Sequence, residues 1–268
     1  MGSLLAQRSA GALAEIVATR CAATGARRQR RSAGGRLSGP TRKRPFMALE
    51  TELKLSLLPA DRARLLAHPL LRAQAPARLP LRNTYFDTPA LALMRQRMAV
   101  RERRIGRQTL LTVKTAGSSV DGLSRRNEWE GPTRPGAFDF AALVDDAALA
   151  ATLVALAGQL VPVFRTDFLR RRWVIHHAGA GIELALDEGS VSTDARAPHG
   201  AQQQALLEVE LELLSGPVDA LFDLARTLAS VPPGEAWPGI RLQPSQRSKA
   251  ERGFDLFLGR STAEEPAP

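Results

Sequence analysis

Apolar and polar residues alternate along many short segments of the chain. In the segment ETELKLSLLP, which begins at Glu50, the charged residues Glu50, Glu52 and Lys54 occupy every second position. The alternate positions are Thr51, Leu53, Leu55 and Leu57. Successive side chains of a β-strand point to opposite faces, so such a segment has one charged face and one apolar face. The segment LLEVELELL at 206–214 repeats the pattern with three glutamates. The alternation therefore predicts strands that pack a core on one side only.

Further segments of the same character bring the prediction to about eight strands. They read LRNTYFD (81–87), MAVRER (98–103), TLLTVKT (109–115), RRNEWE (125–130), FRTDFLRRRWVIHH (164–177) and IELALDEGSV (182–191). Helical spacing predicts one helix that starts at Pro59 and ends near Pro69, a second over 138–160 and a third over 217–230. Short turns connect most of these elements, which favours an antiparallel α+β domain over residues 47–258.

The net charge of +10 comes almost entirely from the first 46 residues. They contain nine arginines and Lys43 against Glu15 alone, a sum of +9, so the rest of the chain carries only +1. This segment has no aromatic residue before Phe46 and is poor material for a core. We predict that residues 1–46 are a disordered basic tail or a start-site extension before Met47, with a transit-like leader or a nucleic-acid tether as alternatives. Residues 259–268 are predicted to be a disordered C-terminus.

Cysteine content and hydropathy exclude several classes of site. The only cysteine, Cys21, lies in the basic segment, so we expect no disulfide, thiolate nucleophile or zinc–thiolate site in the folded part. No apolar stretch is long enough to span a membrane. We therefore expect no membrane partner, no specific nucleic-acid partner and a cytoplasmic location, while the sequence leaves a monomer and a homodimer equally open.

The charged strand faces carry both signs of charge. They contain Arg101 with Arg103, Lys114, Arg126 with Glu128 and Glu130, Arg170 with Arg172, and Glu183 with Asp187. A solvated sheet face would explain any one of these strands. Three glutamates in a row, however, lie only about 7 Å apart and repel one another unless cations are near. A sheet that closes with these faces inward would bring the cations and form a charged lumen, covered outside by helices. Arginine and lysine suit phosphate oxygens, and carboxylates suit a hard cation such as Mg²⁺ or Mn²⁺.

On these motifs the chain resembles the CYTH superfamily, the triphosphate tunnel metalloenzymes. Its signature ExExK is present as Glu50, Glu52 and Lys54. Further motifs follow in the family's order, from Leu49 to Phe254: YFDTPALALMRQRMAVRER, LTVKTAG with GLSRRNEWE, ALDEG, EVELELLSG and SKAERG. The similarity is closest to the bacterial inorganic triphosphatases. The resemblance implies a closed antiparallel eight-stranded β-barrel with helices packed outside. Its tunnel would bind tripolyphosphate, or an organic triphosphate, together with Mg²⁺ or Mn²⁺.

The resemblance also assigns roles to individual residues. The implied phosphate-binding residues are Lys54, Arg101, Arg103, Lys114, Arg126, Arg170 and Lys249, with Arg172 as the alternative to Arg170. The implied metal ligands are Glu50, Glu52, Glu208, Glu210, Glu212 and Asp187, and Glu128 or Glu130 would add acidic lining. Glu50, Glu52 and Lys54 would serve catalysis directly.

The predicted function is hydrolysis of the terminal phosphoanhydride of inorganic tripolyphosphate to pyrophosphate and phosphate. The alternatives are a class IV adenylate cyclase, a thiamine triphosphatase, or a non-catalytic polyphosphate-binding module. A binding module would need the basic residues without the metal carboxylates, and the presence of Glu208 and Glu210 counts against it. Relatives of the triphosphatase branch often continue into a helical CHAD domain, which we do not expect in this chain.

Overall fold

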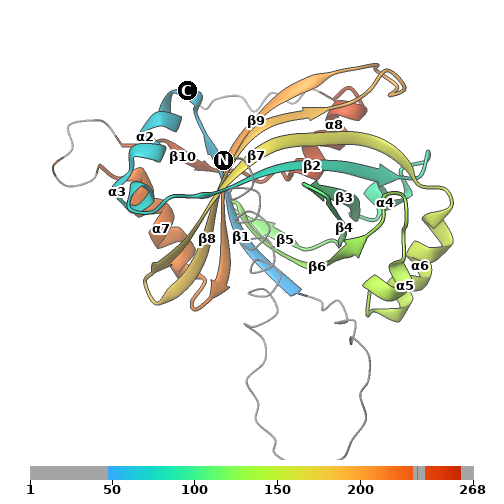
Figure 1. The fold of residues 1–268 in the computed structure, drawn as a ribbon, viewed down its shortest axis with the longest axis horizontal. Helices are drawn as coiled ribbons and strands as arrows, with labels where there is room; N and C mark the ends of the chain where they lie inside the picture. The colour runs from blue at the N-terminus through green and yellow to red at the C-terminus, as the bar shows by residue number, and fades with distance from the viewer. Residues whose placement is uncertain (1–47, 232–233, 235–238, 261–268) are drawn as a thin grey trace, which may run out of the picture. The chain divides into compact units, whose positions relative to one another are not determined.

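A computed structural model describes residues 48–231, 234 and 239–260, which lie within one compact unit. Strands and helices occupy this part of the chain from Ala48 to Phe257 (Figure 1). The predicted basic tail, residues 1–46, and most of the predicted C-terminal tail lie outside the described residues, so both remain predictions. Within the described ranges, no helix combines the length and the hydropathy that crossing a membrane requires.

Eight strands form a closed antiparallel barrel. In order around the ring they are β1 (Ala48–Leu57), β9 (Gln203–Ser215), β8 (Ala180–Ser192), β7 (Val161–His177), β2 (Ala77–Asp87), β3 (Ala99–Ile105), β4 (Gln108–Lys114) and β6 (Leu123–Thr133). The pairing of β1 with β6, which sets Glu50 opposite Arg126, closes the ring. The short strands β5 (Ser118–Val120) and β10 (Leu242–Pro244) pair with β6 and β1. The predicted fold class is confirmed.

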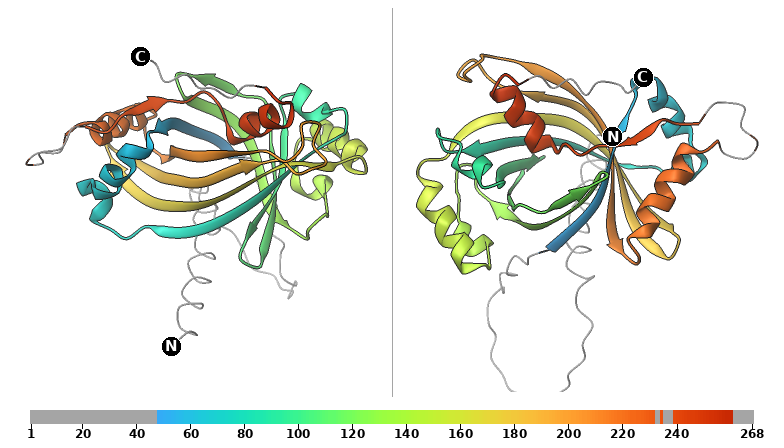
Figure 2. Two further views of the ribbon diagram at one scale, coloured as in Figure 1. Left: turned by 90° about the horizontal axis from the view of Figure 1, so that it is seen from above. Right: turned by 180° about the vertical axis from the view of Figure 1, so that it is seen from behind.

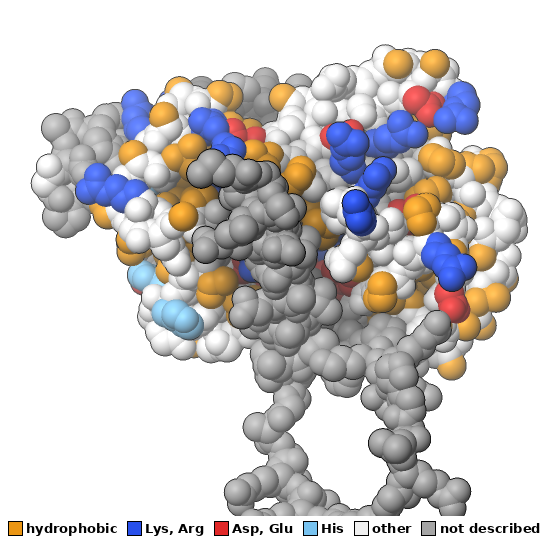
Figure 3. Space-filling model, viewed as in Figure 1, with side chains coloured by type: hydrophobic (Ala, Val, Ile, Leu, Met, Phe, Trp, Pro, Cys, Tyr) orange, Lys and Arg blue, Asp and Glu red, His pale blue; other side chains and the backbone are white. Residues whose placement is uncertain are grey.

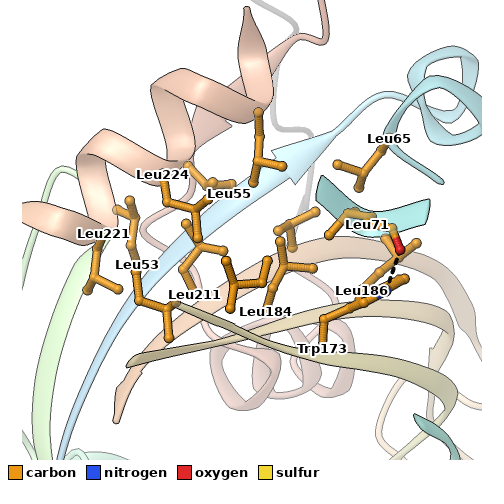
Figure 4. Packing of buried hydrophobic residues seen from close by; sticks show 14 of the residues in the cluster. Leu53, Leu55, Leu65, Leu71, Trp173, Leu184, Leu186, Leu211, Leu221 and Leu224 are labelled. Carbon is orange, nitrogen blue, oxygen red and sulfur yellow. Dashed lines mark hydrogen bonds between the residues drawn. The ribbon is translucent and has the colours of Figure 1, made fainter. Parts of the chain in front are cut away.

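Helices cover the apolar exterior of the barrel on two sides (Figure 1). The outward leucines of β1, β8 and β9 pack against α7 (Asp219–Ala229) and against α2 (Arg62–Ala67) and α3 (Pro69–Arg72), which follow the short helix η1 (Pro59–Asp61). Figure 4 shows Leu221 and Leu224 of α7 above Leu53 and Leu55 of β1. On the other side, α5 (Phe140–Leu143) and α6 (Ala147–Ala157) cover Trp129 and the outward residues of β3 and β4. The apolar faces of the strands are thus turned outward, and the charged faces are turned inward.

Most predicted elements are confirmed, and the helix expected over 138–160 is divided. Asp139 and Asp146 each cap a helix start, because their carboxylates accept hydrogen bonds from the backbone N–H groups of Ala142 and Leu149. Two such caps seven residues apart produce α5 and α6 in place of one continuous helix. The helix from Pro59 ends as predicted, and Pro69 then begins the short α3.

Helix α8 (Lys249–Phe257) lies in the C-terminal segment that the sequence pattern left unassigned. Ser248 and Glu251 form a capping box at its start. The ring of Phe254 packs edge-on against Phe164 of β7, with centroids 5.1 Å apart, and Phe164 stacks on Tyr85 of β2 at 4.4 Å. The rear view in Figure 2 shows α8 across the space that the strands enclose. Helix α4 (Ala92–Arg95) follows β2.

Candidate functional site

The charged strand faces surround one lumen, in which the side chains are nearly inaccessible to solvent. Glu208 is 1% exposed, Glu52 3% and Lys54 4%. Acidic side chains are correspondingly sparse on the outer face drawn in Figure 3. Buried charges are stable only when partners compensate them. In this barrel the partners come from neighbouring strands and from α8, and they fall into three groups.

The first group lies where β1 meets β6. Glu50 accepts hydrogen bonds from Lys114 Nζ at 2.8 and 2.9 Å and from Arg126 Nε at 2.9 Å. Glu52 accepts hydrogen bonds from Lys54 Nζ at 2.5 Å and from Arg126. Burial raises the pKa of Glu50, but Lys114 and Arg126 outweigh this effect and hold the pKa well below its usual value. Lys114 and Arg126 therefore keep Glu50 ionised in the absence of a ligand, and Lys54 and Arg126 contact Glu52 beside it.

The second group is centred on two arginines of β3. Arg101 lies 3.6 Å from Glu128 and 3.7 Å from Glu130, and Arg103 lies 3.8 Å from Glu130. These separations are longer than hydrogen bonds. Burial and the charges of Arg101 and Arg170 lower the pKa of Arg103 to about 10, although Glu130 opposes the shift. Burial lowers the pKa of Arg101, but Tyr85, Glu128 and Glu130 outweigh burial and raise it. None of the three carboxylate contacts is a hydrogen bond, so donors of both arginines remain for another acceptor.

The donors of Arg101 lead to the same conclusion. Arg101 Nε is buried and has no hydrogen-bond partner within the described part of the chain. A buried unsatisfied donor of this kind calls for an explanation, such as a missing ion or ligand. An anion that enters the lumen beside Arg101 and Arg103 would supply the acceptors.

The third group is an acidic triad of Asp187, Glu208 and Glu210. One carboxylate oxygen of each lies within 4.8 Å of the others, close enough to share a metal ion. Arg170 donates to Asp187 at 2.7 and 2.8 Å and to Glu210 at 2.5 Å. Lys249 of α8 lies 2.7 Å from Asp187 and 2.9 Å from Glu210, and it also contacts Glu208. Three clustered carboxylates match the hard oxygen ligands that Mg²⁺ and Mn²⁺ prefer.

The two glutamates of this triad differ in their electrostatic environment. Burial raises the pKa of Glu208, and the attraction of Lys249 does not offset it because Glu210 and Asp187 repel a further negative charge. Burial acts on Glu210 in the same direction, but Lys249, Arg170 and Lys54 hold its pKa well below the usual value. Glu208 is therefore the glutamate of the triad whose charge the local cations stabilise less, and a further cation beside it would favour its ionised form.

The remaining predicted residues lie beside these groups. Glu212 sits directly opposite Glu52 on β1 and Glu183 on β8, outside the triad. Arg172 lies 3.2 Å from Glu183, whereas Arg170 contacts the triad itself. The geometry therefore favours Arg170 over Arg172 as the arginine nearest to the candidate metal position.

Sequence reasoning did not single out several lumen residues. Asn83 of β2 accepts a hydrogen bond from Arg103, and Thr166 of β7 accepts one from Asn83. Phe168 of β7 lies under Lys249 Nζ, 5.1 Å from the ring centroid. Arg252 of α8 lies 3.9 Å from Glu208. The inward positions of Asn83, Thr166 and Phe168 follow from strand alternation, but their types carry no charge pattern that would have drawn attention.

Comparisons with known proteins agree with this description. A family model described as CYTH domain matches residues 48–233. An inorganic triphosphatase of Haemophilus influenzae is 33% identical over 226 residues, which cover 79% of this chain and 56% of that protein. The chain thus spans about half the length of this curated relative. A solved structure from Hippeastrum, described as a putative adenylyl cyclase with a dominant triphosphatase activity, has a TM-score of 0.53 at 22% identity and covers 81% of this chain and 99% of its own.

The fold and the site together define a closed antiparallel β-barrel whose lumen is lined by buried side chains of both charges. With the family model matched over most of the described residues, the chain belongs to the CYTH domain family. The resemblance drawn from the sequence motifs is confirmed.

Proposed function

We propose that this protein hydrolyses the terminal phosphoanhydride of inorganic tripolyphosphate, in the presence of Mg²⁺ or Mn²⁺, to pyrophosphate and phosphate. One observation carries the proposal: a single buried lumen holds two arginines whose contacts with carboxylates are longer than hydrogen bonds, together with three carboxylates close enough to share a metal ion. The first feature suits a polyanion and the second suits its divalent counterion. The triphosphatase of Haemophilus influenzae supports the choice of substrate class.

The cations of the lumen would hold the phosphates in line. Arg101 and Arg103 have donors that no carboxylate fully occupies, and Arg170 and Lys249 lie across the lumen at the acidic triad. Lys54, Lys114 and Arg126 would complete the binding surface next to Glu50 and Glu52. Burial strengthens each of these contacts, because the effective dielectric constant is lower than in water. The protein would therefore act mainly by positioning and by stabilising charge.

Asp187, Glu208 and Glu210 are the residues that would hold the divalent ion. When bound, such an ion offsets negative charge on the transferring phosphoryl oxygens and assists in activating water. Arg170 and Lys249 would then be released from the triad and could donate to phosphate oxygens. Glu50, Glu52 and Glu212 are proposed as further acidic groups that serve metal or water. We also propose a cytoplasmic location.

A panel of substrates tests the proposal. Phosphate release is measured from tripolyphosphate, ATP and thiamine triphosphate, each with Mg²⁺ or Mn²⁺, and cyclic AMP formation is followed in parallel. The expected result is the highest kcat/KM for tripolyphosphate. Dominant formation of cyclic AMP from ATP would assign the tunnel to a cyclase, and binding of polyphosphate without phosphate release under any condition would assign it to a binding module.

A further inference from the structure

Three polar side chains form a row across strands β7, β2 and β3 inside the barrel. Thr166 pairs with Asn83, and Asn83 pairs with Arg103, in the registers of the two neighbouring ladders. Thr166 is fully buried and Asn83 is 1% exposed. The row runs from Thr166 on β7 through Asn83 to Arg103 on β3. It forms part of the lumen wall and contains no carboxylate.

The hydrogen bonds of this row fix the orientation of the Asn83 amide. Arg103 Nε donates to Asn83 Oδ1 at 3.0 Å, and an arginine nitrogen can only donate. Asn83 Nδ2 donates to Thr166 Oγ1 at 2.8 Å and points to the Thr166 backbone carbonyl at 3.4 Å, which can only accept. A flipped amide would lose the hydrogen bond from Arg103 Nε and the contact with the Thr166 carbonyl. Asparagine thus supplies one acceptor and one donor at fixed positions.

Neutrality is the second property of Asn83. Arg103 Nη1 lies 3.8 Å from Glu130, too far for a hydrogen bond, and Nε bonds to an uncharged amide. The position of the guanidinium is therefore fixed by a neutral group, and none of its contacts with Glu130 or Asn83 is a hydrogen bond to a carboxylate. By contrast, the fork of Arg170 is already occupied by Asp187. A carboxylate at position 83 would satisfy Arg103 and reduce its attraction for an anion.

From this geometry we infer that Asn83 is a positioning residue, oriented by Thr166, that holds Arg103 with its terminal nitrogens directed to a phosphate group of the substrate. The inference rests on the proposed function, because it names a residue that prepares the same tunnel for a polyphosphate. Asn83 acts through Arg103 and through the uncharged character of its own amide. A residue that merely fills the barrel wall would not depend on Arg103.

A double-mutant cycle distinguishes a residue that positions Arg103 from one that only fills the barrel wall. Asn83→Ala should raise KM for tripolyphosphate about tenfold with a smaller change in kcat, and the same substitution in an Arg103→Ala background should change KM by less than about twofold. Asn83→Leu, which keeps the approximate size and removes both hydrogen-bonding groups, should also raise KM only when Arg103 is present. It supplies a second cycle if the alanine variant fails to fold. Thr166→Val should give a smaller rise of about threefold, and Thr166→Ser should restore the wild-type KM.

Asp145→Ala is the matched control, because it removes a hydrogen bond to the buried Trp129 on the outside of the barrel. It should lower Tm without changing KM. Equal effects of the Asn83 substitutions with and without Arg103, or no effect on KM in either background, would overturn the inference. If the wild-type protein released no phosphate from tripolyphosphate, the proposed function would fail. The Kd of tripolyphosphate for the same variants, measured by calorimetry, would still test whether Asn83 positions Arg103.

Discussion

Replacing Glu208 by glutamine tests the tunnel most directly. Glu208 is 1% exposed, and its carboxylate belongs to the triad with Asp187 and Glu210. Glutamine keeps the size of the side chain and removes the charge that binds a hard cation. We expect Glu208→Gln to lose nearly all tripolyphosphate hydrolysis while the fold remains intact.

The size of the effect follows from the local charges. The three carboxylates carry −3, and the cations that contact them, Arg170, Lys249 and Arg252, carry +3, so Glu208→Gln changes the net charge of the site from zero to +1. A divalent ion about 4 Å from one carboxylate interacts with it by about 8 kcal/mol at an effective dielectric constant of about 20. Even one third of this energy corresponds to metal binding that is about 100-fold weaker.

Although Glu208→Gln should weaken metal binding, it should not lower the stability of the metal-free protein. Because the folded pKa of Glu208 is raised, its ionised form costs stability above the unfolded pKa of about 4.3. Glu208→Gln removes this cost at neutral pH, so Tm without metal should stay equal or rise. The advantage should disappear in acid, where both the folded and the unfolded states bind the proton.

The assay is phosphate release from tripolyphosphate over a titration of Mg²⁺ or Mn²⁺, with Tm measured on the same samples. Glu188→Gln is the control, because Glu188 follows Asp187 on β8 but contacts Arg62 and Arg171 instead of the triad. The control should keep wild-type metal dependence. Near-wild-type turnover of Glu208→Gln at low metal concentration would refute the assignment of the triad and, with it, the tunnel mechanism.

Three further predictions concern other parts of the tunnel. Lys54→Ala should lower kcat/KM for tripolyphosphate at least tenfold without weakening metal binding measured without substrate, since an ammonium contacts phosphate and cannot ligate a cation; weaker metal binding would contradict this. The pKa of Glu210 is lowered in the folded state, so its carboxylate contributes stability that is lost as pH falls through this folded pKa. Glu210→Gln should therefore lower Tm at pH 7 by an amount that shrinks in acid. A Tm difference that stays constant with pH would argue against the lowered pKa. Gly253→Ala would place a Cβ 2.0 Å from the ring of Phe164 and displace α8. The displacement should lower the free energy of unfolding, measured by chemical denaturation, by about 1–3 kcal/mol and should reduce turnover by moving Lys249. Wild-type stability and turnover would show that α8 adapts without loss.

The sequence alone determined which side chains share a face. Side-chain direction in a strand has a period of two, so Glu50, Glu52 and Lys54 had to lie opposite Leu53 and Leu55, whatever the strand's partners. Trp129 and Trp173 alternate with inward charges in the same way, and both are buried outside the barrel in the cores under the helices. The ordered motifs indicated the family, and with it the barrel.

Only the tertiary structure decided which charges meet. Glu50 contacts Lys114 and Arg126, which follow more than 60 residues later, because β1 closes the ring against β6. The triad combines β8 with β9, and Lys249 reaches it from a helix whose position depends on the packing of aromatic rings. Registers between distant strands and the docking of a helix are set by the closure of the barrel as a whole. No local period encodes them, and the roles of neutral residues such as Asn83 become visible only when the partners are in place.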